Sequence, residues 1–135
     1  MEDYSMDTEQ NKEIARRFIE AINAQDGVEL EAAASGELAA WGSATLLPWL
    51  YATFPGHHMT ITDMVAEGDQ VVARLQTSGG HGAEWRGIPA TGRHFTNTGA
   101  YFLRVDDGKV VELNSLFDDL NLVEQLGGTI TPPTD

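Results

Sequence analysis

Two adjacent aspartates, Asp118 and Asp119, end an apolar, strand-like run near the C-terminus of the sequence. A carboxylate that faces an apolar cavity has a raised pKa and accepts a proton near neutral pH, which makes Asp118 a candidate general base. An aspartate at the start of a helix also serves as its N-cap, because its side chain accepts a backbone N–H of the first turn. Both interpretations of Asp118 stay open, and Asp119 is the better candidate for the cap.

Two further polar residues precede these aspartates. Arg104 could bind an anion through its fork of donors, or it could pair with acidic neighbours at the strand end. Asn114 lies four residues before Asp118 and shares its strand face, because side chains alternate. Its amide could donate to a developing oxyanion, or it could lie at an open sheet edge. We therefore predict a catalytic set of Asp118, Asn114 and Arg104.

The sequence offers little for thiol or metal chemistry. It has no cysteine, which excludes disulfides, thiolate nucleophiles and cysteine-bound zinc. Its four histidines are scattered, and neither of the adjacent pair His57 and His58 has metal-ligand spacing to another histidine or a carboxylate. His81 follows two glycines and could close a loop or contact a ligand. We predict no metal site and no cofactor.

The charge of the protein restricts its partners. The 135 residues fit one domain, and the formal net charge is −13. Such an excess of acids argues against nucleic acid and anionic membrane surfaces as partners. No apolar run approaches the roughly 18 residues of a membrane span, and the acidic N-terminus does not resemble a signal peptide. We expect a cytoplasmic protein with a small-molecule partner.

The hydrophobic pattern predicts helices first and strands second. Helical spacing predicts helices over 8–24, 28–41 (interrupted near Gly36) and 43–54, and from residue 57 the period is two. Strands are expected over 59–68, 70–79, 83–87, 93–105 and 109–117, followed by a helical turn over 118–127. This order predicts an α+β domain over 8–128, with three helices packed on a curved, mostly antiparallel sheet. Residues 1–7 are expected to form a flexible leader and 129–135 a flexible tail.

A curved sheet covered by helices leaves a space in which small apolar ligands bind. Aromatic side chains could form its walls, although they suit a core or a dimer surface equally well. The predicted substrate-binding residues are Trp41, Tyr51, Phe102, His81 and Phe18.

Short motifs spread over residues 10–127 carry a family resemblance. They are Phe54-Pro55, AEGD at 66–69, His81, GIPATGR at 87–93, DGKVVE at 107–112 and QLG at 125–127. In combination they resemble the SnoaL-like polyketide cyclases, also known as ester cyclases. The resemblance implies a cone-shaped α+β fold, a homodimer associated through the sheet, and cofactor-independent chemistry on an apolar or aromatic carbonyl substrate of natural-product biosynthesis.

The resemblance also implies a role for Asp118, which occupies the position of the family's acid/base aspartate. That residue removes a proton next to a carbonyl, and the enolate closes a ring by aldol attack. Asn114 stands where the family usually has Trp, so isomerisation, dehydration, epoxide opening and hydroxylation on the same fold are kept as alternatives. A last alternative is a non-catalytic small-molecule-binding module, which an exposed Asp118 that only caps a helix would favour.

Overall fold

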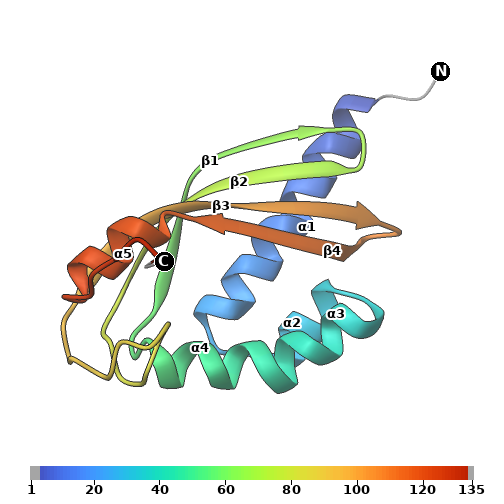
Figure 1. The fold of residues 1–135 in the computed structure, drawn as a ribbon. Coiled ribbons are helices and arrows are strands. Elements are labelled where there is room, and N and C mark those ends of the chain that lie inside the picture. Colours follow the sequence, from blue (N-terminus) through green and yellow to red (C-terminus); the bar gives the residue numbers. More distant parts are fainter. Residues whose placement is uncertain (1–3, 134–135) are drawn as a thin grey trace.

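Helices lie on one side of an antiparallel sheet in the computed structural model, which describes residues 4–133 (Figure 1). The N-terminal helices are α1 (Tyr4–Asn23), α2 (Gly27–Ala33), α3 (Gly36–Trp41), a π-helical turn η1 (Gly42–Leu46) and α4 (Leu47–Thr53). They are followed by β1 (His58–Glu67), β2 (Gln70–Gly79), β3 (Phe95–Asp106), β4 (Lys109–Phe117) and α5 (Asp119–Gln125).

The predicted α+β fold is confirmed, with three local corrections. The helix expected over 28–41 is two helices, because the chain extends at Ala34 and forms a bridge with Val110. Four α-helices therefore precede the sheet, not three. Residues 4–7 of the expected leader are already helical, and the rest of that leader lies outside the described residues. The strand expected over 83–87 is replaced by a tight turn.

The four strands form an antiparallel meander in the order β1-β2-β3-β4. Residues directly opposite each other on neighbouring strands share one face of the sheet. Ala73, Tyr101 and Ser115 form one such row on the inner face, where Ala73 and Tyr101 are buried. The adjacent row, with Phe102 opposite Asn114, lies on the outer face. This alternation decides which strand residues can meet a ligand held under the helices.

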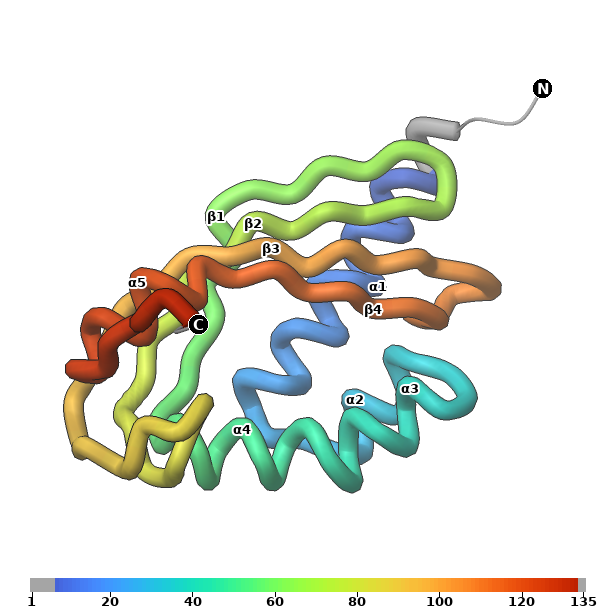
Figure 2. Tube along the Cα trace, viewed as in Figure 1, coloured from blue at the N-terminus to red at the C-terminus, as the bar shows by residue number. Residues whose placement is uncertain are grey.

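The inner face packs on α1, whose buried stripe includes Ala15, Phe18 and Ile22. Asn23 joins the end of this helix to the edge strand β1: its Nδ2 donates to the Met59 carbonyl oxygen at 2.7 Å, and its Oδ1 accepts the Met59 N–H at 2.8 Å. Figure 2 shows α1 descending from the β1–β2 hairpin end toward α4, which lies below the sheet. Among the described helices, none is both long and apolar enough to cross a membrane.

Gly99 on β3 makes room for an aromatic ring of the neighbouring strand. It lies directly opposite Phe117 of β4. A Cβ at position 99 would collide with the Phe117 ring and would lie 2.6 Å from the Leu116 carbonyl oxygen. The Leu116 carbonyl oxygen belongs to the backbone and cannot move away as a flexible side chain can. Only glycine at position 99 therefore leaves room for the Phe117 ring to pack on β3.

We expect Gly99→Ala to lower the free energy of unfolding by about 1–3 kcal/mol, because the added methyl group overpacks this contact. Gly80→Ala is the matched control, since a Cβ there would meet only the Pro55 carbonyl oxygen at an ordinary 3.5 Å. Urea unfolding of both variants and the wild type measures the difference. Equal stability of the two variants would contradict this packing argument.

Candidate active site

A cavity of about 340 Å³ opens between α4, the inner face of the sheet and α5. Its volume lies within the range of small-molecule sites. Most of its wall is apolar or aromatic. The polar side chains that reach it include His57, Arg86, Asn97, Tyr101, Ser115 and Asp119.

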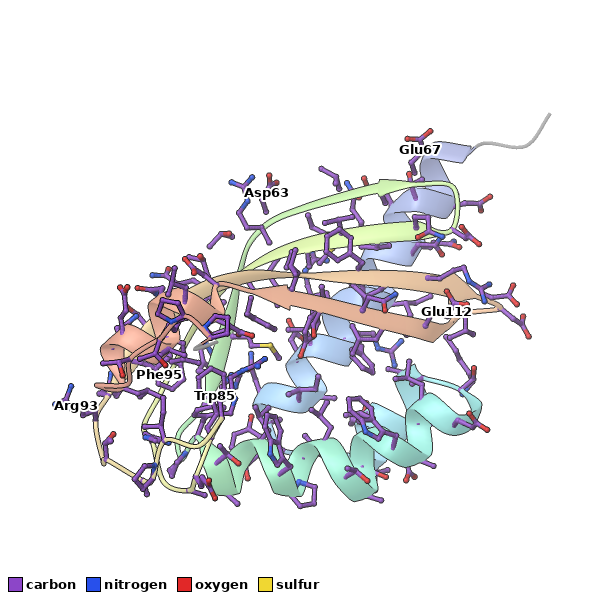
Figure 3. The ribbon with its side chains drawn as sticks, in the orientation of Figure 1. Asp63, Glu67, Trp85, Arg93, Phe95 and Glu112 are labelled. Carbon is purple, nitrogen blue, oxygen red and sulfur yellow. The ribbon has the colours of Figure 1, made fainter. Side chains whose placement is uncertain are left out.

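Phe54, at the end of α4, organises the aromatic wall of the cavity. Its ring makes an edge contact with Phe95 of β3 at a centroid distance of 5.2 Å, and with Trp85 and Trp49 at 6.0 Å each. Figure 3 shows Trp85 and Phe95 in the region between α4 and the α5 end of the sheet. Such pairs add about 0.5–1.5 kcal/mol each beyond the area they bury, so the wall is held firmly in place.

A tight turn places Arg86 at the rim of this cavity. Trp85 and Ile88 exchange two backbone hydrogen bonds of 3.0 and 2.9 Å, and the two residues between them have positive φ, 49° at Arg86 and 81° at Gly87. Two positive φ values are the mark of a type I′ turn. For arginine this conformation costs about 1–2 kcal/mol, and such strain gathers at functional sites.

Arg86 forms an ion pair with Asp119, the first residue of α5. The guanidinium Nη2 lies 2.7 Å from the carboxylate Oδ2, and the guanidinium carbon lies 5.1 Å from the centre of the Trp85 ring. Both side chains line the cavity. The pair therefore presents a positive donor and a negative acceptor side by side to any bound molecule.

Side-chain amides fix α5, and with it Asp119, on strand β3. The Gln125 amide donates to the Thr96 carbonyl oxygen at 2.6 Å and accepts the Thr96 N–H at 3.1 Å. One turn earlier, the Asn121 Nδ2 donates to the Asn97 Oδ1 at 3.0 Å. The helix is thus attached to the sheet at two successive turns, which restricts where Asp119 can move.

The three predicted catalytic residues do not meet at the cavity. Asp118 is exposed, and its carboxylate accepts the Asn121 N–H at 3.1 Å as the N-cap of α5. The cap of α5 is thus Asp118 and not Asp119, which was the better candidate from the sequence, and Asp119 is the aspartate that lines the cavity. Asn114 is exposed on the outer face of β4, opposite Phe102. The expectation that Asp118 and Asn114 face the cavity is wrong, because their positions alternate with the inward-facing ones.

Arg104 also lies on the outer face, where it pairs with acidic neighbours. Its Nη2 donates to Glu112 Oε1 at 3.0 Å, and Asp69 lies 4.0 Å away. The hydrogen bond from Arg104 lowers the pKa of the Glu112 carboxyl. Figure 3 shows Glu112 at the end of the sheet remote from Trp85. Arg104 thus supports the strand end and does not reach the cavity.

The five predicted substrate-binding residues have other places in the structure. Within the described part of the chain, none of them lines the cavity. Phe18 is buried in the core, and Trp41 and Phe102 are exposed on α3 and on the outer sheet face. The Tyr51 hydroxyl donates to the Ile22 carbonyl oxygen, and burial raises its pKa. His81 is buried, and its Nδ1 accepts the Thr91 N–H at 3.2 Å, which closes the loop after β2.

Tyr101 and Ser115 are cavity residues that the sequence analysis did not select. They lie opposite each other on the inner face of β3 and β4. Leu103 and Val105 alternate with the charged Arg104 and Asp106, and Tyr101 lies two residues before Leu103, so the period of two was the available signal that places Tyr101 on the inner face. The sequence indicated the turn at Arg86 more weakly: Gly87 follows Arg86, and glycine is common at the second central position of a type I′ turn.

Burial keeps two of the cavity's titratable groups neutral. Burial raises the pKa of Tyr101, with a smaller contribution from Tyr51, so its phenol stays a hydrogen-bond donor. Burial, and to a lesser extent the charge of His58, lowers the pKa of His57 to about 4. The Nδ1 of His57 is buried without a hydrogen-bond partner. No group of three or more histidine or acidic side chains in the described residues is arranged to hold a metal ion.

Residues 12–126 match a family model described as SnoaL-like polyketide cyclase. The chain belongs to this cyclase family. It is 33% identical over 85 residues to the aklanonic acid methyl ester cyclase DnrD of Streptomyces peucetius. That alignment covers 62% of this chain but only 59% of DnrD, so the chain spans about three fifths of the length of this curated relative.

Solved structures show the same SnoaL-like fold. TsrD from Streptomyces laurentii is 26% identical with a TM-score of 0.76, and the match covers 96% of this chain and 100% of TsrD. IdmH from Streptomyces antibioticus is 28% identical with a TM-score of 0.69, and the match covers 87% of this chain and 99% of IdmH. The cone-shaped α+β architecture expected from the motifs is therefore confirmed.

The lowered pKa of His57 predicts a pH-dependent stability. Between about pH 6.5 and about pH 4 the unfolded imidazole binds a proton and the folded one does not, so unfolding takes up a proton. The free energy of unfolding should therefore fall by at most about 1.4 kcal/mol per pH unit as the pH drops through this window.

Urea unfolding at about pH 7 and about pH 5 measures this contribution. His57→Asn should lose less stability than the wild type between the two conditions, because asparagine does not titrate. His94→Asn, at an exposed position, serves as the control and should follow the wild type. An unchanged pH dependence in His57→Asn would show that His57 does not cause it.

Proposed function

We propose that this chain is a cyclase that closes a ring in an apolar, polyketide-derived carbonyl ester, with Asp119 as its acid/base group. The family assignment and the name of the relative DnrD support a cyclisation of an ester. The observation that carries the proposal is the place of Asp119. Within the described residues it is the carboxylate that lines the apolar cavity, and α5 holds it there.

The reaction proceeds by proton transfer and carbon–carbon bond formation. Asp119 takes a proton from the carbon next to a carbonyl, and the C–H electron pair becomes an enolate. The enolate carbon attacks a second carbonyl of the same molecule and forms the ring bond. The alkoxide oxygen then receives the proton back from Asp119. Atoms and electrons balance without an oxidant or reductant.

Two hydrogen-bond donors could stabilise the negative charge that develops on the substrate oxygens during this reaction. The Arg86 guanidinium lies beside Asp119, and the Tyr101 phenol lines the same cavity as a protonated donor. Donors fixed in an apolar site stabilise an oxyanion strongly, because they need not reorganise as charge forms. In this proposal Arg86 binds the enolate oxygen, and Tyr101 donates to the carbonyl that is attacked.

Asp119→Asn should lower kcat/KM for aklanonic acid methyl ester by at least about 100-fold, since an amide cannot take the proton. Asp118→Asn is the matched control. Asparagine caps helices as well as aspartate does, so this variant should keep its fold and stay within about threefold of the wild type. Product formation followed by chromatography measures both. Loss of turnover in Asp118→Asn with turnover kept in Asp119→Asn would overturn the assignment.

One observation favours a second candidate, a non-catalytic binding module. Asp118 is exposed, and Asp119 already has a cation partner at 2.7 Å, so the described cavity lining holds no unpaired carboxylate. A binding module would take up apolar carbonyl compounds without converting them. Wild-type protein that binds the ester at a stoichiometry of about one but yields no product would favour this candidate.

For the outer face of the sheet we propose contact with a second copy of the chain. Val65 of β1 lies opposite Val72, which in turn lies opposite Phe102 of β3. Val65 and Phe102 are exposed, as is Leu116 in the neighbouring row. Exposed hydrophobic side chains gathered on one face favour association.

Phe102→Glu should convert a wild-type dimer to a monomer, because it replaces the large exposed ring of this apolar row with a charge. Val28→Glu, an exposed substitution on α2, should leave the dimer intact. Sedimentation velocity at several concentrations distinguishes the two states. A wild-type protein that is monomeric, or a Phe102→Glu variant that stays dimeric, would refute this interface.

A further inference from the structure

A second cavity lies on the other side of the Arg86–Asp119 ion pair. It measures about 310 Å³ and is lined in part by the apolar side chains of Ile88, Leu120, Val123 and Ile130. Arg86 and Asp119 line both this outer groove and the inner cavity. The two spaces therefore meet at a single pair of charged side chains.

The ion pair between the two spaces can open at low cost. Its side chains are 60% and 46% exposed, for Arg86 and Asp119 respectively. Ion pairs with this exposure contribute little to stability, because water replaces the partner readily. A polar oxygen of a bound molecule can thus exchange with the Asp119 carboxylate as partner of the guanidinium.

Two large apolar side chains that line the outer groove are exposed to solvent. Leu120 of α5 is 53% exposed, and Ile130 in the segment after α5 is 65% exposed. Both face the same groove next to a guanidinium. Large apolar groups gathered around one fixed charge match a ligand that carries an apolar arm directly after a polar oxygen.

We propose that the outer groove is a second substrate subsite, continuous with the inner cavity across the Arg86–Asp119 pair. The ligand is an elongated carbonyl compound: flat rings occupy the inner cavity, an ester oxygen binds Arg86, and the apolar arm beyond that oxygen lies against Leu120 and Ile130. The type I′ turn holds Arg86 at the junction of the two spaces. This inference rests on the proposed function for the identity of the substrate, but the binding geometry can be tested without turnover.

Two esters of anthraquinone-2-carboxylic acid test the subsite. The methyl ester fills the inner cavity and reaches Arg86, and the butyl ester adds three methylene groups for the outer groove. The butyl ester should bind wild-type protein at least about 10-fold more tightly, because each buried methylene contributes up to about 0.8 kcal/mol. Dissociation constants come from quenching of tryptophan fluorescence.

Two variants locate the added affinity. Leu120→Ser/Ile130→Ser changes exposed positions, so it should fold as the wild type does, bind the methyl ester equally well and lose the preference for the butyl ester. Arg86→Gly suits the positive φ of the turn, so it should also fold, and it should weaken both esters by a similar factor. Urea midpoints confirm folding in each case.

A butyl preference that is absent from the wild type, or that survives Leu120→Ser/Ile130→Ser, would overturn the subsite. An Arg86→Gly variant that binds both esters as the wild type does would overturn the role of the ion pair. These outcomes are separate from the proposed function. Failure of the cyclase proposal appears as missing turnover of aklanonic acid methyl ester, whatever the ratio of the two dissociation constants.

Discussion

The aromatic contacts of Phe54 hold α4, the loop after β2 and strand β3 together around the cavity. Phe54 ends α4 and is almost completely buried, and its ring contacts side chains from the helix itself, from the loop after β2 and from β3. Edge contacts between aromatic rings are directional, so they fix angles as well as distances. Because the Trp85 ring packs in this cluster, the turn that carries the adjacent Arg86 is held in position.

The site combines rigid supports with a weak central contact. Amide side chains attach α5 to β3, and the aromatic cluster supports the turn that carries Arg86. The ion pair that these supports bring together is half exposed and sits on a strained backbone. A contact of this kind adds little to stability, but it holds two charged groups at a short distance where a ligand can reach them.

The two faces of the sheet have different properties because side chains alternate along each strand. The inner face of β3 and β4 carries Tyr101 and Ser115 toward the cavity. The outer face carries Phe102, Asn114 and the Arg104–Glu112 pair toward solvent. A shift of one residue in register would exchange these two sets of side chains. The β-bulge between Arg104 and Val105 does not have this effect at the site, because it lies beyond Tyr101 and Ser115.

The sequence by itself determined that helices precede an antiparallel meander, and it determined the hairpins at Gly68 and Asp107-Gly108 and the family motifs, because these depend on local periodicity and on turn residues. It did not determine which aspartate faces the cavity. Asp118 and Asp119 are adjacent and chemically identical, and either could cap a helix or serve as a base. Only the tertiary structure decided between them, because the orientation of α5 depends on hydrogen bonds from Asn121 and Gln125 to a strand more than twenty residues away. The sequence also did not predict the ion pair between Arg86 and Asp119, because these residues meet only when α5 packs against the sheet.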